Sequence, residues 1–202
     1  MPFPKRLAIA SRNPHKLREL GRICSDWPVE WVTVETHDGP WPDVDEPHET
    51  YLENAAEKAL AVASALGIPA MADDSGLEVD GLGGGPGPRS ARFAGEDASD
   101  EANLATLISV VEEMPLDERR ARYVCLAVVS TPEGGAVSAD GTCNGTLVTR
   151  RRGERGFGYD PIFVPDQTPG RTMAELADEE KDRISHRGRA FRALRELVAA
   201  DG

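Results

Sequence analysis

Segments with strand-like and helix-like patterns alternate along this chain, and that alternation limits the folds open to it. Residues 7–10 (LAIA) form a short apolar run typical of a buried strand. Pro14 then stands where proline is tolerated, at the first position of a helix that continues through Leu20. Residues 53–66 are rich in alanine and other strong helix formers, and Gly67 follows them as a stop. Strands and helices in turn predict an α/β protein rather than a helical bundle or a β-sandwich.

The second half of the chain continues this pattern. Residues 122–130 and 136–149 read as two strands that pair antiparallel through a Pro-Glu-Gly-Gly turn at 132–135. A capping-box pattern at 172–175 precedes a last amphipathic helix that begins at Ser185.

Length and composition indicate one domain spanning 1–202. The chain has 202 residues, 40% of them hydrophobic, which suffices for one core. Its net charge of −12 disfavours binding to a nucleic acid polymer. No apolar run approaches the roughly 20 residues that span a bilayer, and the N-terminus lacks the apolar stretch of a signal peptide, so we expect no membrane contact and a cytoplasmic location. Three widely separated cysteines, none in a CxxC pair, are expected to be buried, reduced and inert.

Several common catalytic motifs are absent. The glycine-rich stretch 76–89 has no clean G-x-G-x-x-G between a strand and a helix, so a dinucleotide fingerprint is disfavoured. The sequence also lacks a Walker A motif, a Gly-x-Ser-x-Gly elbow and an H-E-x-x-H zinc arrangement.

Two acidic clusters remain as candidate chemistry. Asp73 and Asp74 follow an apolar segment, where we expect a strand to end. A second cluster, residues 43–46 (DVDE), lies between two prolines in a segment that cannot be an uninterrupted helix. Carboxylates of this kind suit Mg²⁺, which bridges one or two of them to substrate phosphates. The alternative is a solvated acidic loop with an aspartate that caps a helix.

The loop at residues 11–16 (SRNPHK) offers a phosphate site. Hydroxyl, amide and ammonium donors gather there at a helix N-terminus, where free N–H groups and the helix dipole favour an anion. The alternative is an ordinary helix cap made by Ser11 or Asn13.

These residues belong to a larger set that resembles the inosine triphosphate pyrophosphatase family, also called the Ham1-like or non-standard purine NTP pyrophosphatases. The matching blocks are spread over nearly the whole chain, at residues 10–16, 51–59, 72–77, 83–92, 156–163, 172–176, 180–181 and 184–187.

The resemblance implies a fold and an activity. The fold is α/β, an elongated mixed β-sheet flanked by helices, with a substrate cleft between two lobes. The activity is Mg²⁺-dependent hydrolysis, at the α-phosphorus, of non-standard purine nucleoside triphosphates (ITP, dITP, XTP) to the monophosphate and pyrophosphate. A homodimer is also implied.

The same resemblance assigns the phosphate and metal residues. Asp74 would bind Mg²⁺ and activate the attacking water, with Ser75 as a substrate contact and either Asp45 or Glu46 as the second metal ligand. The triphosphate would be held by the loop residues Ser11, Arg12, Asn13, Pro14, His15 and Lys16.

A base pocket is implied as well. It would be formed by Phe157, Gly158, Tyr159 and Asp160, with Phe157 stacking on the purine. The opposite wall would be lined by Lys181, His186 and Arg187. Donors directed at O6 would favour inosine and xanthosine over adenosine, whose 6-amino group leaves them unpaired. Without the resemblance, the aromatic residues read as core, Lys181 as a helix-end cation and His186 as a first-turn residue.

Two departures from the family pattern leave assignments open. Residues 45–48 (DEPH) stand where relatives commonly have Glu-Glu-Thr-Gly. The Pro47-His48 pair stiffens and redirects this loop, so the choice between Asp45 and Glu46 stays open. His15 replaces a glycine before Lys16.

Two other functions also remain open. One is a related phosphohydrolase that prefers modified pyrimidine nucleotides, and the other is a nucleotide sensor that binds without turnover.

Overall fold

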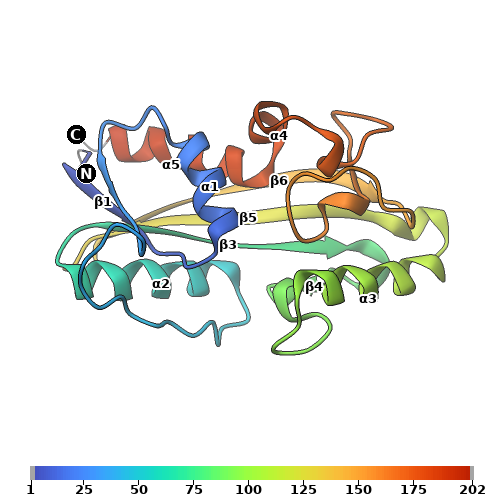
Figure 1. The fold of residues 1–202 in the computed structure, drawn as a ribbon, viewed down its shortest axis with the longest axis horizontal. Helices are drawn as coiled ribbons and strands as arrows, with labels where there is room; N and C mark the ends of the chain where they lie inside the picture. The colour runs from blue at the N-terminus through green and yellow to red at the C-terminus, as the bar shows by residue number, and fades with distance from the viewer. Residues whose placement is uncertain (1–2, 201–202) are drawn as a thin grey trace. The chain divides into compact units, whose positions relative to one another are not determined.

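The computed structural model describes residues 3–200 and has the mixed α/β fold that the alternating pattern predicts (Figure 1). The strands are β1 Arg6–Ile9, β2 Glu30–Val32, β3 Ala70–Val79, β4 Pro86–Gly87, β5 Arg120–Ser130, β6 Ala136–Leu147 and β7 Phe163–Pro165. The helices are α1 Pro14–Ile23, α2 Tyr51–Leu66, α3 Asp100–Glu112, α4 Asp178–Ile184 and α5 His186–Ala200.

Among these residues the strands form one mixed sheet. Its order is β2-β1-β3-β5-β6-β7, and β4 pairs with β3 off this path. Strand β1 pairs parallel with both β2 and β3, with Ala8 opposite Ala70 in the second pair. Strands β3 and β4 pair antiparallel, as do β6 and β7. The parallel pairs follow from the helical crossovers α1 and α2, which return the chain to the same end of the sheet.

The residue contacts divide the chain into two compact units. Of the described residues, unit 1 comprises 3–74, 125–141 and 187–200, and unit 2 comprises 75–124 and 142–186. Strands β3, β5 and β6 each contribute residues to both units. The assignment of 1–202 to a single domain stays a prediction.

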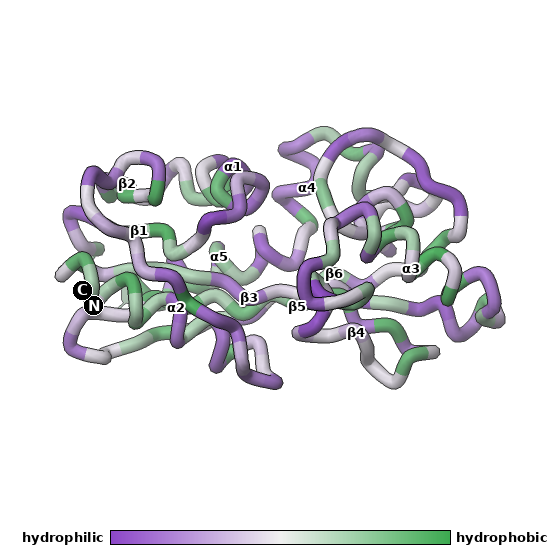
Figure 2. The backbone as a smooth tube through the Cα atoms, turned by 60° about the horizontal axis from the view of Figure 1, so that its bottom comes forward, coloured by the Kyte–Doolittle hydropathy of each residue, from purple (hydrophilic) through white to green (hydrophobic). Residues whose placement is uncertain are grey.

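Unit 1 has a core on each face of its strands because successive residues of β1 point to opposite sides. Leu7 and Ile9 pack with residues of α1 and α5, such as Phe191. Ala8 packs with Ala59 and other small residues of α2. Figure 1 shows α1 and α5 on one side of the strands and α2 on the other, and Figure 2 shows the hydrophobic colour of β1.

Unit 2 is built on a single cluster. Leu104, Leu107 and Val111 lie on one face of α3 and pack in the same cluster as Leu77 of β3 and Phe163 of β7. Ser99 caps α3 by accepting a hydrogen bond from the backbone N–H of Ala102 at 3.2 Å. This helix was not predicted from the sequence.

The sequence-based boundaries of most other elements are confirmed. Pro14 is at the first turn of α1, and Gly67 ends α2 in the left-handed conformation at φ 65°. The capping box at 172–175 is present. The three cysteines are buried and free.

One boundary was wrong. Strand β3 does not end at Asp73 but continues through Val79. The two aspartates therefore lie inside a strand, where burial of their neighbours on both faces keeps the backbone extended.

Between residues 3 and 200, every helix is too short or too polar to cross a bilayer.

The contact of β6 with β7 depends on a glycine. A Cβ at Gly145 would lie 2.4 Å from the carbonyl oxygen of Val164 and 2.7 Å from the Phe163 ring. We expect Gly145→Ala to lower the free energy of unfolding by about 1–3 kcal/mol, because overpacking forces the strand pair apart. Urea unfolding followed by circular dichroism measures the change.

Gly21→Ala is the matched control. Gly21 lies in α1 with no atom within 4 Å of a Cβ added there. Alanine should therefore raise the free energy of unfolding, by roughly 0.5–1 kcal/mol. Equal effects of the two substitutions would contradict the packing argument.

Candidate functional site

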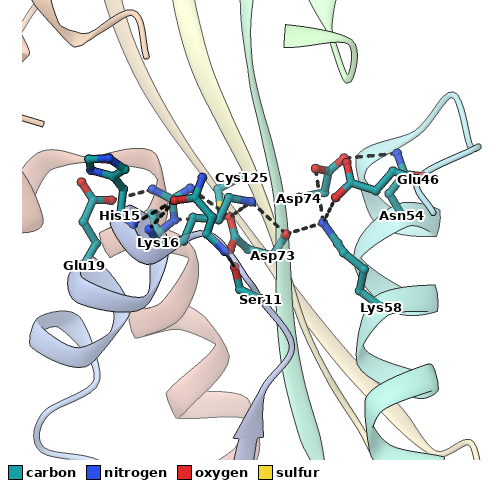
Figure 3. A network of polar contacts seen from close by, with 12 residues as sticks. Ser11, His15, Lys16, Glu19, Glu46, Asn54, Lys58, Asp73, Asp74 and Cys125 are labelled. Atoms are coloured by element: carbon teal, nitrogen blue, oxygen red, sulfur yellow. Dashed lines mark hydrogen bonds and ion pairs between the residues drawn. The ribbon is translucent and has the colours of Figure 1, made fainter. Parts of the chain in front are cut away.

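Asp73 and Asp74 are neighbours on β3, but their side chains have different partners, because adjacent side chains of a strand point to opposite faces. Figure 3 shows the Asp73 carboxylate among residues of α1 and the Asp74 carboxylate beside α2. Both residues are buried, with relative exposures of 3% and 4%. Buried carboxylates need charged or hydrogen-bonding partners, and each has its own set.

Asp74 is bound by two residues of α2. The side-chain amide of Asn54 donates to Asp74 Oδ2 at 3.2 Å, and Lys58 Nζ lies 3.6 Å from Asp74 Oδ1. Burial raises the pKa of Asp74 above its ordinary value, against the opposing effect of Lys58 and Lys16. A carboxylate with a raised pKa beside ammonium groups is suited to accept a proton from a neighbouring water.

Glu46 joins the same network, whereas Asp45 is exposed. Lys58 Nζ donates to Glu46 Oε1 at 2.7 Å. Burial alone lowers the pKa of Lys58, but Asp74 and Glu46 outweigh burial and raise it, so the ammonium stays charged. Of the two residues left open by the sequence, Glu46 is thus the one that shares a partner with Asp74.

The segment before α2 is tied to this network through Asn54. Its side-chain oxygen accepts from the His48 backbone N–H at 3.0 Å, and its amide donates to the His48 carbonyl at 3.1 Å. The His48 ring also contacts the Glu57 carboxylate. The Pro47-His48 segment, which departs from the family pattern, is therefore held against α2.

Asp73 lies in a buried ion network. Its Oδ2 atom accepts from Arg187 at 3.0 Å, and Arg187 also donates to Glu19 Oε2 at 2.6 Å. Lys16 Nζ lies 3.2 Å from Asp73 Oδ2 and 3.3 Å from its carbonyl oxygen. This carbonyl also accepts from Lys58 at 2.9 Å, so two ammonium groups approach one oxygen.

The predicted phosphate loop is a capped helix start. Asn13 Oδ1 accepts from the backbone N–H groups of His15 and Lys16 at 2.8 and 3.3 Å, and Asn13 N–H donates to Ser11 Oγ at 3.2 Å. Arg12 donates to the Trp41 carbonyl at 2.9 Å. The ordinary cap is thus present, and an anion here would meet the Lys16 ammonium rather than two uncapped N–H groups.

In unit 2, Asp160 organises the predicted base-binding segment. Its Oδ2 atom accepts from Lys181 Nζ at 2.5 Å and from the Phe157 N–H at 2.9 Å. Lys181 Nζ lies 5.1 Å from the centroid of the half-buried Phe157 ring. Phe157 stands between Gly156 and Gly158, both at positive φ, which lets the loop turn sharply around the ring.

Tyr159 and His186, which are also predicted to contact the base, make contacts within the protein itself. The Tyr159 ring is in the core, and its hydroxyl donates to the Ser90 carbonyl at 2.7 Å. The His186 ring is buried and stacks on Tyr123, with centroids 4.6 Å apart. These contacts favour the structural alternatives for both rings, and their role in binding stays a prediction.

Arg187 is likewise held by two carboxylates of unit 1, through the contacts with Asp73 and Glu19. Ser75 follows Asp74 on β3 and is half-buried. These contacts do not test the predicted roles of Ser75 and Arg187 in substrate binding.

The donor set beside Asp74 fits a hard divalent cation. Among residues 3–200 no group of three or more His, Cys, Asp or Glu is gathered as a metal site. Mg²⁺ needs fewer protein ligands, because it keeps several waters and binds one or two carboxylates together with substrate phosphates. The Asp74 and Glu46 carboxylates, which share Lys58, supply that number.

Sequence reasoning assigned no role to Asn54, Lys58 or Glu19, and it did not foresee the ion pairs of the Asp73 side chain. Asn54 and Lys58 lie four residues apart on α2, so they share one helix face. An amide and a lysine on an otherwise alanine-rich helix face could have indicated that these two residues have a polar partner. Nothing comparable marked Glu19, whose partner Arg187 is 168 residues away in the chain.

The Asp160 cluster predicts a difference between two glycines. A Cβ at Gly156 would lie 2.0 Å from Asp160 Oδ2, whereas one at Gly158 would meet no atom within 4 Å. Both alanine variants are destabilised by about 1–2 kcal/mol, because alanine is strained in the left-handed conformation. Gly156→Ala should cost at least about 1 kcal/mol more, because it also separates buried polar partners. Equal losses of unfolding free energy in urea would contradict this.

Comparisons with known proteins identify the family of this chain. The Ham1 family model matches residues 7–197. The chain is 47% identical over 188 residues to a dITP/XTP pyrophosphatase of Syntrophobacter fumaroxidans, covering 93% of this chain and 79% of that protein. It is 44% identical over 198 residues to a dITP/XTP pyrophosphatase of Geobacter sulfurreducens, covering 98% of each. The solved structure of the Staphylococcus aureus Ham1 protein matches with a TM-score of 0.81 and 39% identity, covering 98% of this chain and all (100%) of that one. The chain belongs to the Ham1 family.

Proposed function

We propose that this protein hydrolyses non-standard purine nucleoside triphosphates, such as dITP, ITP and XTP, to the monophosphate and pyrophosphate. Relatives at 44% and 47% identity bear the name dITP/XTP pyrophosphatase. The observation that carries the proposal is the buried Asp74 carboxylate, which Asn54 orients and which lies 3.6 Å from the Lys58 ammonium, a placement suited to activating water beside a phosphate.

Unit 1 supplies the phosphate chemistry. Lys16 and Lys58 bring two ammonium groups to the Asp73 carbonyl oxygen, where they can neutralise the charge of a triphosphate and of the leaving pyrophosphate. Ser11, Arg12 and His15 line the same loop as Lys16 and are proposed as further phosphate contacts, while Asn13 and Pro14 set the start of the helix.

Asp74 and Glu46 are the proposed ligands of Mg²⁺. The ion, when bound, supplies a positive charge that neutralises the phosphates and lowers the pKa of water. Asn54 donates to one oxygen of Asp74 and leaves the other directed toward Lys58, so the carboxylate is held in one orientation. Asp74 takes the proton from the attacking water, and no phospho-enzyme is needed.

Unit 2 supplies contacts to the base. Phe157 offers a half-buried ring on which a purine can stack. Lys181, held by Asp160 beside this ring, is the proposed donor to a 6-oxo group. An adenine amino group would leave that donor unpaired, which is the physical basis for selectivity.

The remaining assignments follow from composition and family membership. The net charge of −12 favours a small nucleotide over a nucleic acid polymer as partner. We also propose a homodimer and a cytoplasmic location. The competing functions are hydrolysis of modified pyrimidine nucleotides and nucleotide sensing without turnover.

The first test is pyrophosphate release from a panel of nucleotides. Purified protein should hydrolyse inosine and xanthosine triphosphates at least about a hundredfold more efficiently than adenosine or thymidine triphosphate, because only a 6-oxo purine pairs with the proposed donor. EDTA should abolish the activity. Preference for pyrimidines would move the protein to the competing hydrolase class, and binding without turnover would indicate a sensor.

The second test is Asp74→Asn. The amide keeps the size of the side chain and can still accept from Asn54, but it cannot take a proton. We expect kcat to fall on the order of a hundredfold or more, with the fold intact by circular dichroism. Asp140→Asn, at an exposed position of β6, is the control and should leave kcat unchanged. A normal kcat for Asp74→Asn would exclude Asp74 as the base.

A further inference from the structure

The ammonium group of Lys58 stands among oxygens that a divalent cation would use. Its Nζ atom lies 2.7 Å from Glu46 Oε1, 3.6 Å from Asp74 Oδ1 and 2.9 Å from the Asp73 carbonyl oxygen (Figure 3). Two carboxylates and a carbonyl are the hard oxygen ligands that Mg²⁺ and Mn²⁺ prefer. A lysine and a metal ion at this place would therefore compete for the same partners.

Charge makes that competition strong. With Lys58 present, one positive charge already offsets the two carboxylates of Asp74 and Glu46. The Lys58 side chain is only 10% exposed and that of Asp74 only 6%, so water and salt screen this pair weakly. A divalent ion entering here would meet a like charge at close range.

The Lys58 ammonium can move out of this site. Lys58 lies on the regular helix α2, which fixes its Cα, while its four-carbon stem is flexible. Its Nζ atom already shares the Asp73 carbonyl with Lys16, the proposed phosphate-binding cation. An incoming triphosphate would offer Lys58 an anion that replaces Glu46.

We propose that Lys58 is a place-holding cation, which fills the divalent site of the nucleotide-free protein and lets a metal ion bind tightly only after Lys58 moves to another anion. The inference rests on the metal ligands of the proposed function and deepens it, because it couples metal loading to arrival of the triphosphate.

Manganese binding to the nucleotide-free protein tests the proposal without any turnover. Isothermal titration calorimetry with Mn²⁺ alone should give a Kd for Lys58→Met at least about tenfold lower than for the unsubstituted protein, a change of about 1.4 kcal/mol. Mn²⁺ should also raise the melting temperature of Lys58→Met more than that of the unsubstituted protein, because a ligand stabilises the folded state that binds it. An unchanged Kd would overturn the proposal.

Two control variants distinguish the loss of the Lys58 ammonium from a general change of net charge or of packing. Lys5→Met removes one positive charge from an exposed position of unit 1 and should leave the Kd unchanged. Lys58→Arg keeps the charge and should bind Mn²⁺ as weakly as the unsubstituted protein. Tight binding by either control would overturn the proposal, since the gain would then come from net charge or from altered packing. Should Lys58→Met not fold, Lys58→Gln replaces it in the same comparison.

A double variant locates the ion. Glu46→Gln combined with Lys58→Met should lose the added affinity, because one of the two carboxylate ligands is gone. Retained affinity would place the ion elsewhere and overturn the proposal. These titrations contain no nucleotide, so a gain of Mn²⁺ affinity in Lys58→Met stands even if the nucleotide panel shows no hydrolysis. Hydrolysis by the protein without such a gain would refute the place-holding role of Lys58 and leave the proposed function intact.

Discussion

Two adjacent carboxylates on one buried strand must be neutralised separately, and the polar network of unit 1 is arranged around that requirement. The strand directs Asp73 and Asp74 to opposite faces, so their side chains pair with different cations. Asp73 is paired with Arg187 from α5, and Asp74 lies beside Lys58 from α2. The ion pairs thereby connect β3 to the helix on each of its faces, and loss of either cation would weaken the compensation of a buried charge.

Unit 2 uses the same principle with one carboxylate. Asp160 accepts from a backbone N–H at Phe157 and from the Lys181 ammonium, so it orders a loop and holds a cation at once. Gly156 makes room for the carboxylate, and its left-handed backbone turns the loop. In each unit the partners of the buried charges come from separate elements, an arrangement that keeps the side chains oriented.

The elements of the fold could largely be predicted from local patterns. Pro14, Gly67 and the capping box at 172–175 act through neighbouring backbone groups, so their effect is visible in a short window of sequence. Helix α3 was missed because its N-cap, Ser99, follows a polar segment without a clear period. The end of β3 was misplaced because two aspartates look like a loop until their buried partners are known.

The sequence by itself determined the α/β class, several helix ends, the family resemblance and the position of the two acidic clusters, because these depend on local backbone chemistry and on the order of motifs along the chain. The tertiary structure alone decided which carboxylate meets which cation. It separated Asp73 from Asp74, brought Glu46 rather than Asp45 to Lys58, and enclosed Arg187 between carboxylates. Such pairings join residues far apart in the chain, and only the packing of helices onto a strand fixes the distances on which electrostatic interactions depend.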